Sequence, residues 1–196
     1  MATMETVSLP NVLVETRNLP EGPSRRGRAL ILPGERYTVD QPLLSWAAMM
    51  LEQCGWQVNA VRWDMSGLDR EPGVFVTAAA EKLAEEAPAA ERTLVVGKSL
   101  ASHAAGWAAA RGYPSVWLTP LLAESAIRDA IVNSTNPTLA IGGSGDPWWR
   151  PVPPRDGLEV FEIENANHAL RLPDWRASTR VLADVTDRIE RFAARI

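Results

Sequence analysis

The stretch that decides the fold is TLVVGKSLASHA, residues 93–104. Its β-branched start predicts a buried strand, and an alanine-rich helical pattern follows at once, which leaves no residues for a loop. A turn this abrupt holds Ser99 in a cramped backbone conformation and pushes its hydroxyl group outward, as in a nucleophile elbow. The small residues Gly97 and Ala101 allow the strand and the helix to come close at the bend. The working hypothesis is a serine hydrolase with Ser99 at its centre.

Short apolar runs alternate with helical patterns along the whole chain. Strands are predicted at residues 12–16, 28–32, 57–63, 93–96, 115–118, 138–141 and 158–163, and helices at 42–54, 77–87, 100–111, 121–132 and about 174–195. Residues 18–27, rich in proline, glycine and arginine, predict a loop. Brief connections between such elements indicate right-handed βαβ units and a mainly parallel sheet with helices on both faces. We therefore expect one α/β domain over residues 1–196, in which residues 1–27 form an N-terminal strand and loop.

The composition is that of a globular protein. Hydrophobic residues make up 46% of the 196 residues and charged residues 22%, which argues against disorder. A formal net charge of -4 without a long basic run argues against nucleic acid as a partner. Cys54 is the only cysteine, so no intrachain disulfide can form, and neither a leader peptide nor an apolar membrane span is visible. We expect a cytoplasmic protein that binds neither nucleic acid nor a membrane, and its oligomeric state stays open.

Polar residues follow the predicted strands at the points where these strands end. In a parallel sheet the carboxyl ends of the strands meet at one edge, where functional groups gather. Ser99, Asp146 and His168 each lie just past such an end, in that chain order. One further βα unit fits between Ser99 and Asp146, and one strand fits between Asp146 and His168. This order, together with the elbow, matches the α/β-hydrolase pattern.

The sequence resembles the α/β-hydrolase family from about Arg28 to the C-terminus. Three segments carry the resemblance: VVGKSLA at 95–101, GGSGD at 142–146 and NANHAL at 165–170, which look like the elbow, the acid loop and the histidine loop. The resemblance implies the α/β-hydrolase fold with Ser99 as the nucleophile and His168 as the general base and acid. It implies that Asp146 orients the imidazole ring.

The sequence departs from the family pattern at two points. Ala101 replaces the second glycine of the elbow, and Pro33-Gly34 stands where many members carry His-Gly. An oxyanion hole needs two backbone N–H groups aimed at the attacked carbonyl oxygen. One is expected from Leu100, at the start of the elbow helix, where unpaired N–H groups favour an anion. The family pattern places the other after the first core strand, at Glu35 or, as a second choice, at Arg36.

Other residues compete for two of these roles. His103, the only other histidine, lies one turn into the elbow helix on the side of Ser99, so it is an alternative base without an obvious acid partner. Asp64 and Glu164 are alternatives to Asp146.

The tripeptide Gly97-Lys98-Ser99 looks like the end of a phosphate-binding loop. That pattern requires glycine where this chain has Arg92, and the preceding residues predict a strand instead of a loop. We expect Lys98 to turn outward from the elbow, and contact with an acidic substrate stays open.

Two tryptophans directly follow the predicted acid. Trp148 and Trp149 lie between two prolines beside the predicted site, so we expect substrate contact there, with simple coverage of the sheet end as the alternative. The segment 119–137, where larger family members insert a lid, has room for only one helix. The site is therefore expected to be shallow and open.

These observations favour cleavage of a small-molecule ester or thioester through an acyl-serine, with no metal and no organic cofactor. Two alternatives remain, because one fold hosts many functions. The chain is a non-catalytic binding protein on the same scaffold, or it uses the same site for acyl transfer or lyase chemistry.

Overall fold

The computed structural model describes residues 12–17, 26–65 and 71–196. Its elements in chain order are β1 (Val12–Arg17), β2 (Gly27–Leu32), α1 (Pro42–Gln53), β3 (Trp56–Trp63), α2 (Pro72–Glu86), β4 (Thr93–Lys98), the 3₁₀ helix η1 (Ser99–Ala104), α3 (Ala105–Ala110), β5 (Ser115–Leu118), α4 (Ser125–Val132), β6 (Thr138–Gly143), β7 (Leu158–Ile163) and α5 (Trp175–Ala193). All seven predicted strands are confirmed. The start of the chain and most of the loop predicted at 18–27 lie outside the described residues.

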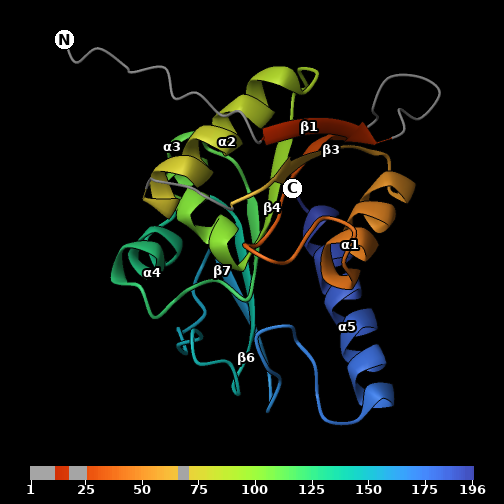
Figure 1. Ribbon diagram of the computed structural model, residues 1–196, viewed down its shortest axis with the longest axis vertical. Helices are drawn as coiled ribbons and strands as arrows, with labels where there is room; N and C mark the ends of the chain where they lie inside the picture. The colour runs from red at the N-terminus through yellow and green to blue at the C-terminus, as the bar shows by residue number, and fades with distance from the viewer. Residues whose placement is uncertain (1–11, 18–25, 66–70) are drawn as a thin grey trace.

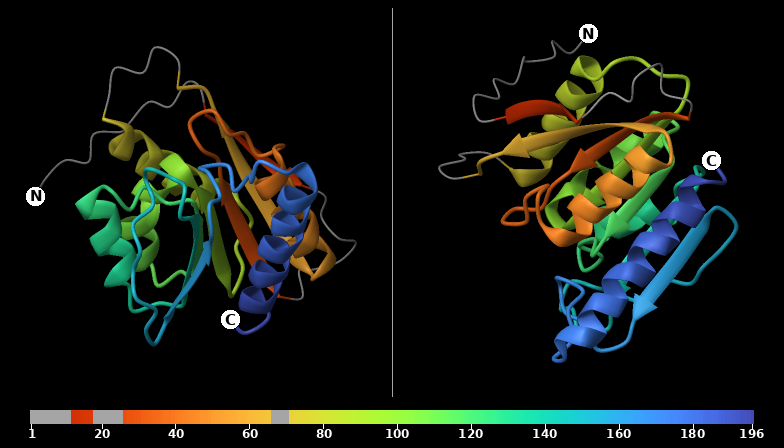
Figure 2. Two further views of the ribbon diagram at one scale, coloured as in Figure 1. Left: turned by 90° about the horizontal axis from the view of Figure 1, so that it is seen from below. Right: turned by 90° about the vertical axis from the view of Figure 1, so that its right-hand side faces the viewer.

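The strands form one sheet in the order β1-β3-β2-β4-β5-β6-β7. Strand β1 pairs with β3 in the antiparallel sense, and the other described pairs are parallel. Helices α1 and α5 cover one face of the sheet, and α2, α3 and α4 cover the other (Figure 1). The two further views show the same three layers (Figure 2). The structure therefore confirms a mainly parallel α/β sheet between two layers of helices.

Alternate residues of the strands feed two separate hydrophobic clusters. On β2, Leu30 and Leu32 belong to the cluster that includes residues of α2, α3 and α4. Ala29 and Ile31 belong to the cluster that includes residues of α1 and α5. Successive side chains of a strand point to opposite faces, so a strand buried on both sides reads as a continuous apolar run. This explains why apolar runs were the clearest signal in the sequence.

Helices α2 and α4 begin at other residues than predicted. Helix α2 begins at Pro72 instead of residue 77, because proline suits a first helical turn and the early residues Phe75 and Val76 are buried. Helix α4 begins at Ser125 instead of residue 121. The segment before it is held by other partners, since the N–H of Leu121 donates to the Ser102 hydroxyl group and that of Ala123 to the carbonyl of Trp148.

A buried arginine ties α2 to the sheet. Arg28 of β2 is 8% exposed, and its guanidinium donates to the Thr93 hydroxyl group at 3.0 Å. It donates further to the carbonyls of Ala84 and Ala87, at the end of α2. The last carbonyls of a helix have no partner within the helix, and a cation there is favourable.

Among the described residues, no helix has both the length and the apolar composition that crossing a membrane requires.

Candidate active site

Ser99, His168 and Asp146 lie together at the carboxyl edge of the sheet. The Ser99 Oγ atom lies 2.7 Å from His168 Nε2, and His168 Nδ1 lies 2.7 Å from Asp146 Oδ2. A carboxylate only accepts hydrogen bonds, so Nδ1 carries a proton and Nε2 is the free acceptor for the serine hydroxyl group. The hydroxyl group of Ser99 is within hydrogen-bond reach of a base, His168, and this base is within reach of Asp146, which orients it.

Ser99 occupies a strained position at the sharp turn. It follows β4 directly, begins η1 and has a φ of 53°, in the left-handed region that non-glycine residues rarely adopt. Its carbonyl accepts a hydrogen bond of 2.6 Å from the hydroxyl group of Ser102, which in turn accepts one from the N–H of Leu121. The helix predicted at 100–111 is thus a 3₁₀ helix followed by α3, and Ser102 fastens its first turn.

Gly97 makes room at the elbow in two directions. A Cβ atom there would lie 2.5 Å from the ring of Trp117 on β5 and 3.0 Å from the Cβ atom of Ala101. The sequence indicated the close approach of strand and helix. The structure adds that the tighter contact is with Trp117 of the neighbouring strand.

The acid loop is packed directly against the histidine loop. The side chain of Asp146 is fully buried, and its second oxygen, Oδ1, accepts a hydrogen bond of 2.9 Å from the N–H of Trp148. A Cβ atom on Gly143 would lie 2.1 Å from the carbonyl oxygen of Ala166. Only glycine allows this approach, which brings Asp146 within reach of His168.

Asn167 shapes the loop that carries the histidine. Its side-chain oxygen accepts hydrogen bonds from the N–H groups of Ala169, at 2.9 Å, and Arg171, at 3.0 Å. Asparagine favours turns of this kind, because its short side chain bonds to nearby backbone. The signal for this turn is visible in the sequence as the asparagine immediately before His168.

Strained backbone is concentrated around the site. Four non-glycine residues of the described chain have positive φ angles, namely Ser99, Thr119, Asn165 and Leu170. Ser99 is the candidate nucleophile, Thr119 directly follows β5, and Asn165 and Leu170 lie at the two ends of the histidine loop. Strain of this kind persists only where the surrounding structure imposes it, and it gathers at functional sites.

Lys98 does not turn outward, which corrects our expectation. Its side chain is 2% exposed, and Nζ donates to the Thr119 hydroxyl group at 2.7 Å and to the carbonyl oxygen of His168 at 2.9 Å. The alternation of β4 explains the direction, because Lys98 is the last residue of a strand that is buried on both faces. A substrate therefore does not reach this ammonium group from solvent.

The turn expected to supply an oxyanion donor lies against the elbow. The N–H of Gly34 donates to the carbonyl of Tyr37 at 2.9 Å, which closes a tight turn around Glu35 and Arg36. A Cβ atom on Gly34 would lie 3.5 Å from the carbonyl oxygen of Lys98, the residue before Ser99. Leu100 is the second residue of η1. The geometry brings the Glu35 turn and Leu100 to the same end of β4, and their role as donors stays a prediction.

The alternative base has another partner. His103 Nε2 lies 3.8 Å from the Glu124 carboxylate, whereas the residue hydrogen bonded to Ser99 is His168. The group bonded to His168 is Asp146, instead of the alternatives Asp64 or Glu164.

The two tryptophans of the acid loop differ in exposure. Trp149 is 3% exposed, and its ring lies against Gly142 while its N–H donates to Glu162. Trp148 is 45% exposed. Trp149 thus packs in the core, and Trp148 is the exposed ring of the two. Substrate contact in this loop stays a prediction, and the structure favours Trp148 for it.

No group of three or more His, Cys, Asp or Glu side chains in the described part of the chain is arranged to hold a metal ion.

No model of a known protein family matches the sequence, and the curated proteins give no match either. Solved structures do match in three dimensions. An α/β serine hydrolase homologue from Coxiella burnetii has a TM-score of 0.68 at 14% identity, over 94% of both chains. Est1E from Butyrivibrio proteoclasticus, in a structure with ferulic acid bound, has a TM-score of 0.69 at 13% identity, over 94% of both chains.

A third structure is an α/β serine hydrolase without a lid, from Xanthomonas campestris. Its TM-score is 0.65 at 16% identity, over 94% of this chain and 88% of that chain. In the present chain the segment 119–137, where a lid would be inserted, holds one helix, α4. Three observations lead to the same fold: the strand order, the sharp turn after β4 and the similarity to these solved structures. The fold of this chain is that of the α/β-hydrolases, in its form without a lid.

Proposed function

We propose that the protein is a serine hydrolase that cleaves a small ester or thioester through an acyl-serine intermediate. The observation that supports this most strongly is the pair of 2.7 Å contacts that links Ser99 to His168 and His168 to Asp146. A hydroxyl group is a weak nucleophile until a base takes its proton, and this base has its tautomer set by a buried carboxylate.

The reaction follows from this geometry. His168 Nε2 takes the Ser99 proton as Oγ attacks the carbonyl carbon, and the oxygen becomes an oxyanion that the N–H groups of Leu100 and Glu35 stabilise. His168 then gives the proton to the leaving alkoxide or thiolate as the tetrahedral intermediate collapses to the acyl-serine. Water, deprotonated by His168, attacks the acyl group in the same way and frees Ser99. Asp146 stabilises the imidazolium formed in each half of the cycle.

The surroundings of the triad favour a small substrate or one presented from outside. The side chain of His168 is 34% exposed, and α4 is the one helix between β5 and β6. Trp148, exposed beside Asp146, offers an aromatic surface for an acyl group or an aryl leaving group. Ferulic acid bound to Est1E, whose fold is similar, makes aryl-substituted esters a natural part of a substrate panel.

Steady-state and burst kinetics test the proposal. The wild type should hydrolyse p-nitrophenyl acetate or butyrate, with an initial burst close to one p-nitrophenol per chain if deacylation is slow. Ser99→Ala and His168→Ala should each lose about 10⁴-fold or more in kcat. His103→Ala is the matched control, since it removes the other histidine, and it should retain kcat within about twofold. Equal turnover by Ser99→Ala and the wild type would refute the proposal.

A further inference from the structure

Lys98, a buried lysine next to the candidate nucleophile, has no role in the proposed hydrolysis steps. The chain has 2 lysines among 20 basic residues, Lys82 and Lys98. Lys98 is 2% exposed, whereas lysine is almost never fully buried unless it is paired. Burial of an ammonium group is costly, so its retention at this position calls for compensating partners.

The partners of Lys98 come from three separate segments. Nζ donates to the hydroxyl group of Thr119, at the end of β5, and to the backbone carbonyl of His168. It lies 4.9 Å from the centre of the Tyr37 ring, which belongs to the turn after β2. Hydrogen bonds from a charged donor are about twice as strong as neutral ones, and an ammonium group over a ring adds to them.

These contacts attach His168 to the elbow at two points. The ring nitrogen Nε2 of His168 is hydrogen bonded to Ser99. The backbone carbonyl of His168 accepts a hydrogen bond from Lys98, the residue before Ser99 in the chain. The histidine loop is bounded by Asn165 and Leu170, both with strained positive φ angles. A loop in a strained conformation needs fixed contacts to stay in place, and the contact to Lys98 acts on the very residue that must meet Ser99.

We propose that Lys98, as an ammonium group, is a positioning residue that fastens the backbone of His168 and so keeps its imidazole in line between Ser99 and Asp146. The proposal rests on the proposed function and adds a residue to it. Lys98 acts through His168 and touches no reacting atom.

The environment of Lys98 makes its hydrogen bond to His168 sensitive to pH. Burial lowers the pKa of Lys98 to about 8, and the Asp146 carboxylate opposes this shift. Burial raises the pKa of Tyr37, and two smaller effects oppose this shift: the hydrogen bond that its hydroxyl group accepts from the N–H of Leu43, and the charge of Arg171. Tyr37 therefore stays protonated while Lys98 titrates. The neutral amine formed above a pH of about 8 is a weaker donor to His168.

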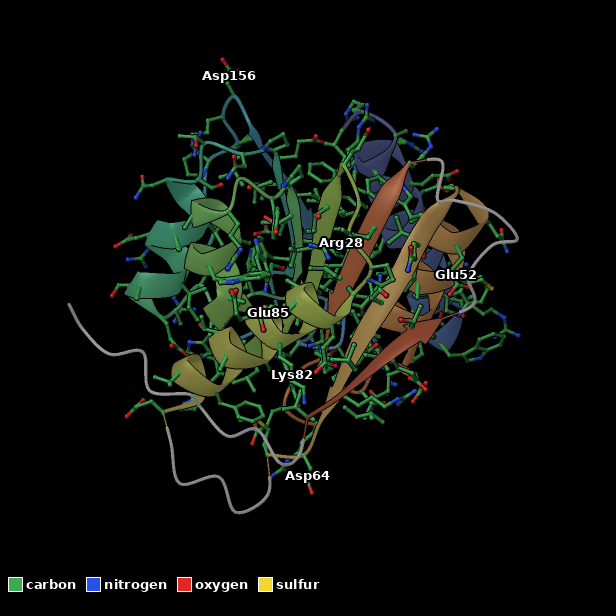
Figure 3. All side chains as sticks on the ribbon, turned by 90° about the horizontal axis from the view of Figure 1, so that it is seen from above. Arg28, Glu52, Asp64, Lys82, Glu85 and Asp156 are labelled. Carbon is green, nitrogen blue, oxygen red and sulfur yellow. The ribbon has the colours of Figure 1, made fainter. Side chains whose placement is uncertain are left out.

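Kinetics over a range from about pH 6 to about pH 10 test this inference, with p-nitrophenyl acetate as substrate. Lys98→Met removes the charge and both hydrogen bonds at nearly constant volume. It should lower kcat by about 10²-fold and change KM by less than about threefold, since orientation is lost and substrate contacts are not. Lys98→Arg keeps a charged donor and should restore part of kcat. Lys82→Met is the matched control (Figure 3), because Lys82 lies on α2, bonds to the Val12 carbonyl and should behave as wild type.

The pH profile separates positioning from a merely structural role. In the wild type, kcat should fall on an alkaline limb with a midpoint of about 8, and both Lys98 variants should lack this limb. A variant Lys98→Met with the kcat and the alkaline limb of the wild type would overturn the inference, even while Ser99→Ala confirms the hydrolase.

Magnetic resonance tests the same inference without turnover. Lysine labelled with ¹³C at Cε gives two signals, which Lys82→Met assigns. The Lys98 signal should titrate near pH 8, and the His168 Nδ1 proton signal should change over the same range. These readouts decide the matter if Lys98→Met fails to fold or if the protein proves not to hydrolyse esters. Titration of Lys98 with no change in the His168 signal would contradict the inference.

Discussion

Asp146 Oδ2 lies 2.7 Å from Nδ1 of His168, and the Asp146 side chain is completely buried. Its other oxygen is occupied by the N–H of Trp148. One carboxylate oxygen thus accepts from Trp148 and the other from Nδ1, and because a carboxylate only accepts, this contact keeps the imidazole proton on Nδ1. The tautomer that leaves Nε2 free for the Ser99 proton follows from this single contact.

The substitution Asp146→Asn tests that relationship at constant volume. An amide can present its NH₂ group to Nδ1, which favours the tautomer with the proton on Nε2 and leaves no base for Ser99. We expect kcat to fall by about 10⁴-fold with little change in the thermal midpoint. Glu164→Gln is the control, because Glu164 is exposed in the turn between β7 and His168, and it should leave kcat within about twofold. A variant Asp146→Asn with wild-type kcat would remove Asp146 from the mechanism.

The close approach of the acid and histidine loops is tested by Gly143→Ala. The added Cβ atom would lie 2.1 Å from the carbonyl oxygen of Ala166, so the histidine loop has to move away from Asp146. We expect a loss of about 3 kcal/mol in the free energy of unfolding and at least about 10²-fold in kcat. Gly106→Ala provides the contrast, since its Cβ atom meets nothing closer than 4.0 Å and alanine suits a helix. Equal effects of the two substitutions on kcat would contradict the packing described.

The adjacent tryptophans should respond in opposite ways to truncation. Trp149→Ala removes a buried ring and should cost about 3 to 5 kcal/mol in the free energy of unfolding. Trp148→Ala should cost less than about 1 kcal/mol. It should instead lower kcat/KM by about tenfold for aryl esters relative to acetate esters. Denaturant titrations and a panel of esters measure the two effects, and Trp175→Ala, another exposed tryptophan, controls for loss of surface aromatics. If Trp148→Ala had the kcat/KM of the wild type for every ester of the panel, Trp148 would be excluded from the substrate site.

Burial of Lys98 predicts how stability depends on pH. Its pKa is about 8 in the folded chain and 10.5 as a model value, so between these values the unfolded chain binds more protons. The wild type should therefore gain up to about 3 kcal/mol in the free energy of unfolding, relative to Lys98→Met, as pH rises through this window. The comparison with Lys98→Met cancels other groups, such as Tyr37, that titrate nearby. Denaturant titrations along the window measure the difference, and a flat difference would contradict the burial of a charged lysine.

Much of the fold was predictable because its signals are local. Parallel strands covered on both faces, such as β2 and β6, must be apolar along most of their length, and that requirement revealed them. The edge strand β7 is only partly buried and includes two glutamates, so it followed from its place in the alternation of strands and helices. The site residues Ser99, Asp146 and His168 were also predictable, since each follows a predicted strand and their chain order is informative. The structure shows their spatial relationship, and their catalytic roles belong to the proposed function.

The details that escaped prediction depend on contacts between distant segments. Lys98 continues the alternation of β4 and so turns inward. The groups that compensate its burial, the Thr119 hydroxyl group and the carbonyl of His168, come from distant segments and are not visible from the pattern around residue 98. Helix α4 begins at Ser125, after a segment whose N–H groups donate to Ser102 and to the carbonyl of Trp148, both distant in the chain. Trp148 and Trp149 are adjacent residues of the same type, so the sequence does not show which of them is buried. The structure shows that the ring of Trp149 packs against Gly142.

Covalent labelling with a fluorophosphonate, read by intact mass and peptide mapping, tests the central claim most directly. The wild type should gain one adduct per chain, located on Ser99, because the phosphorus centre captures an activated serine oxygen. Ser99→Ala should gain none, and His168→Ala should react far more slowly. An adduct of equal extent on Ser99→Ala, or an adduct located on another residue of the wild type, would contradict the assignment of Ser99 as the nucleophile.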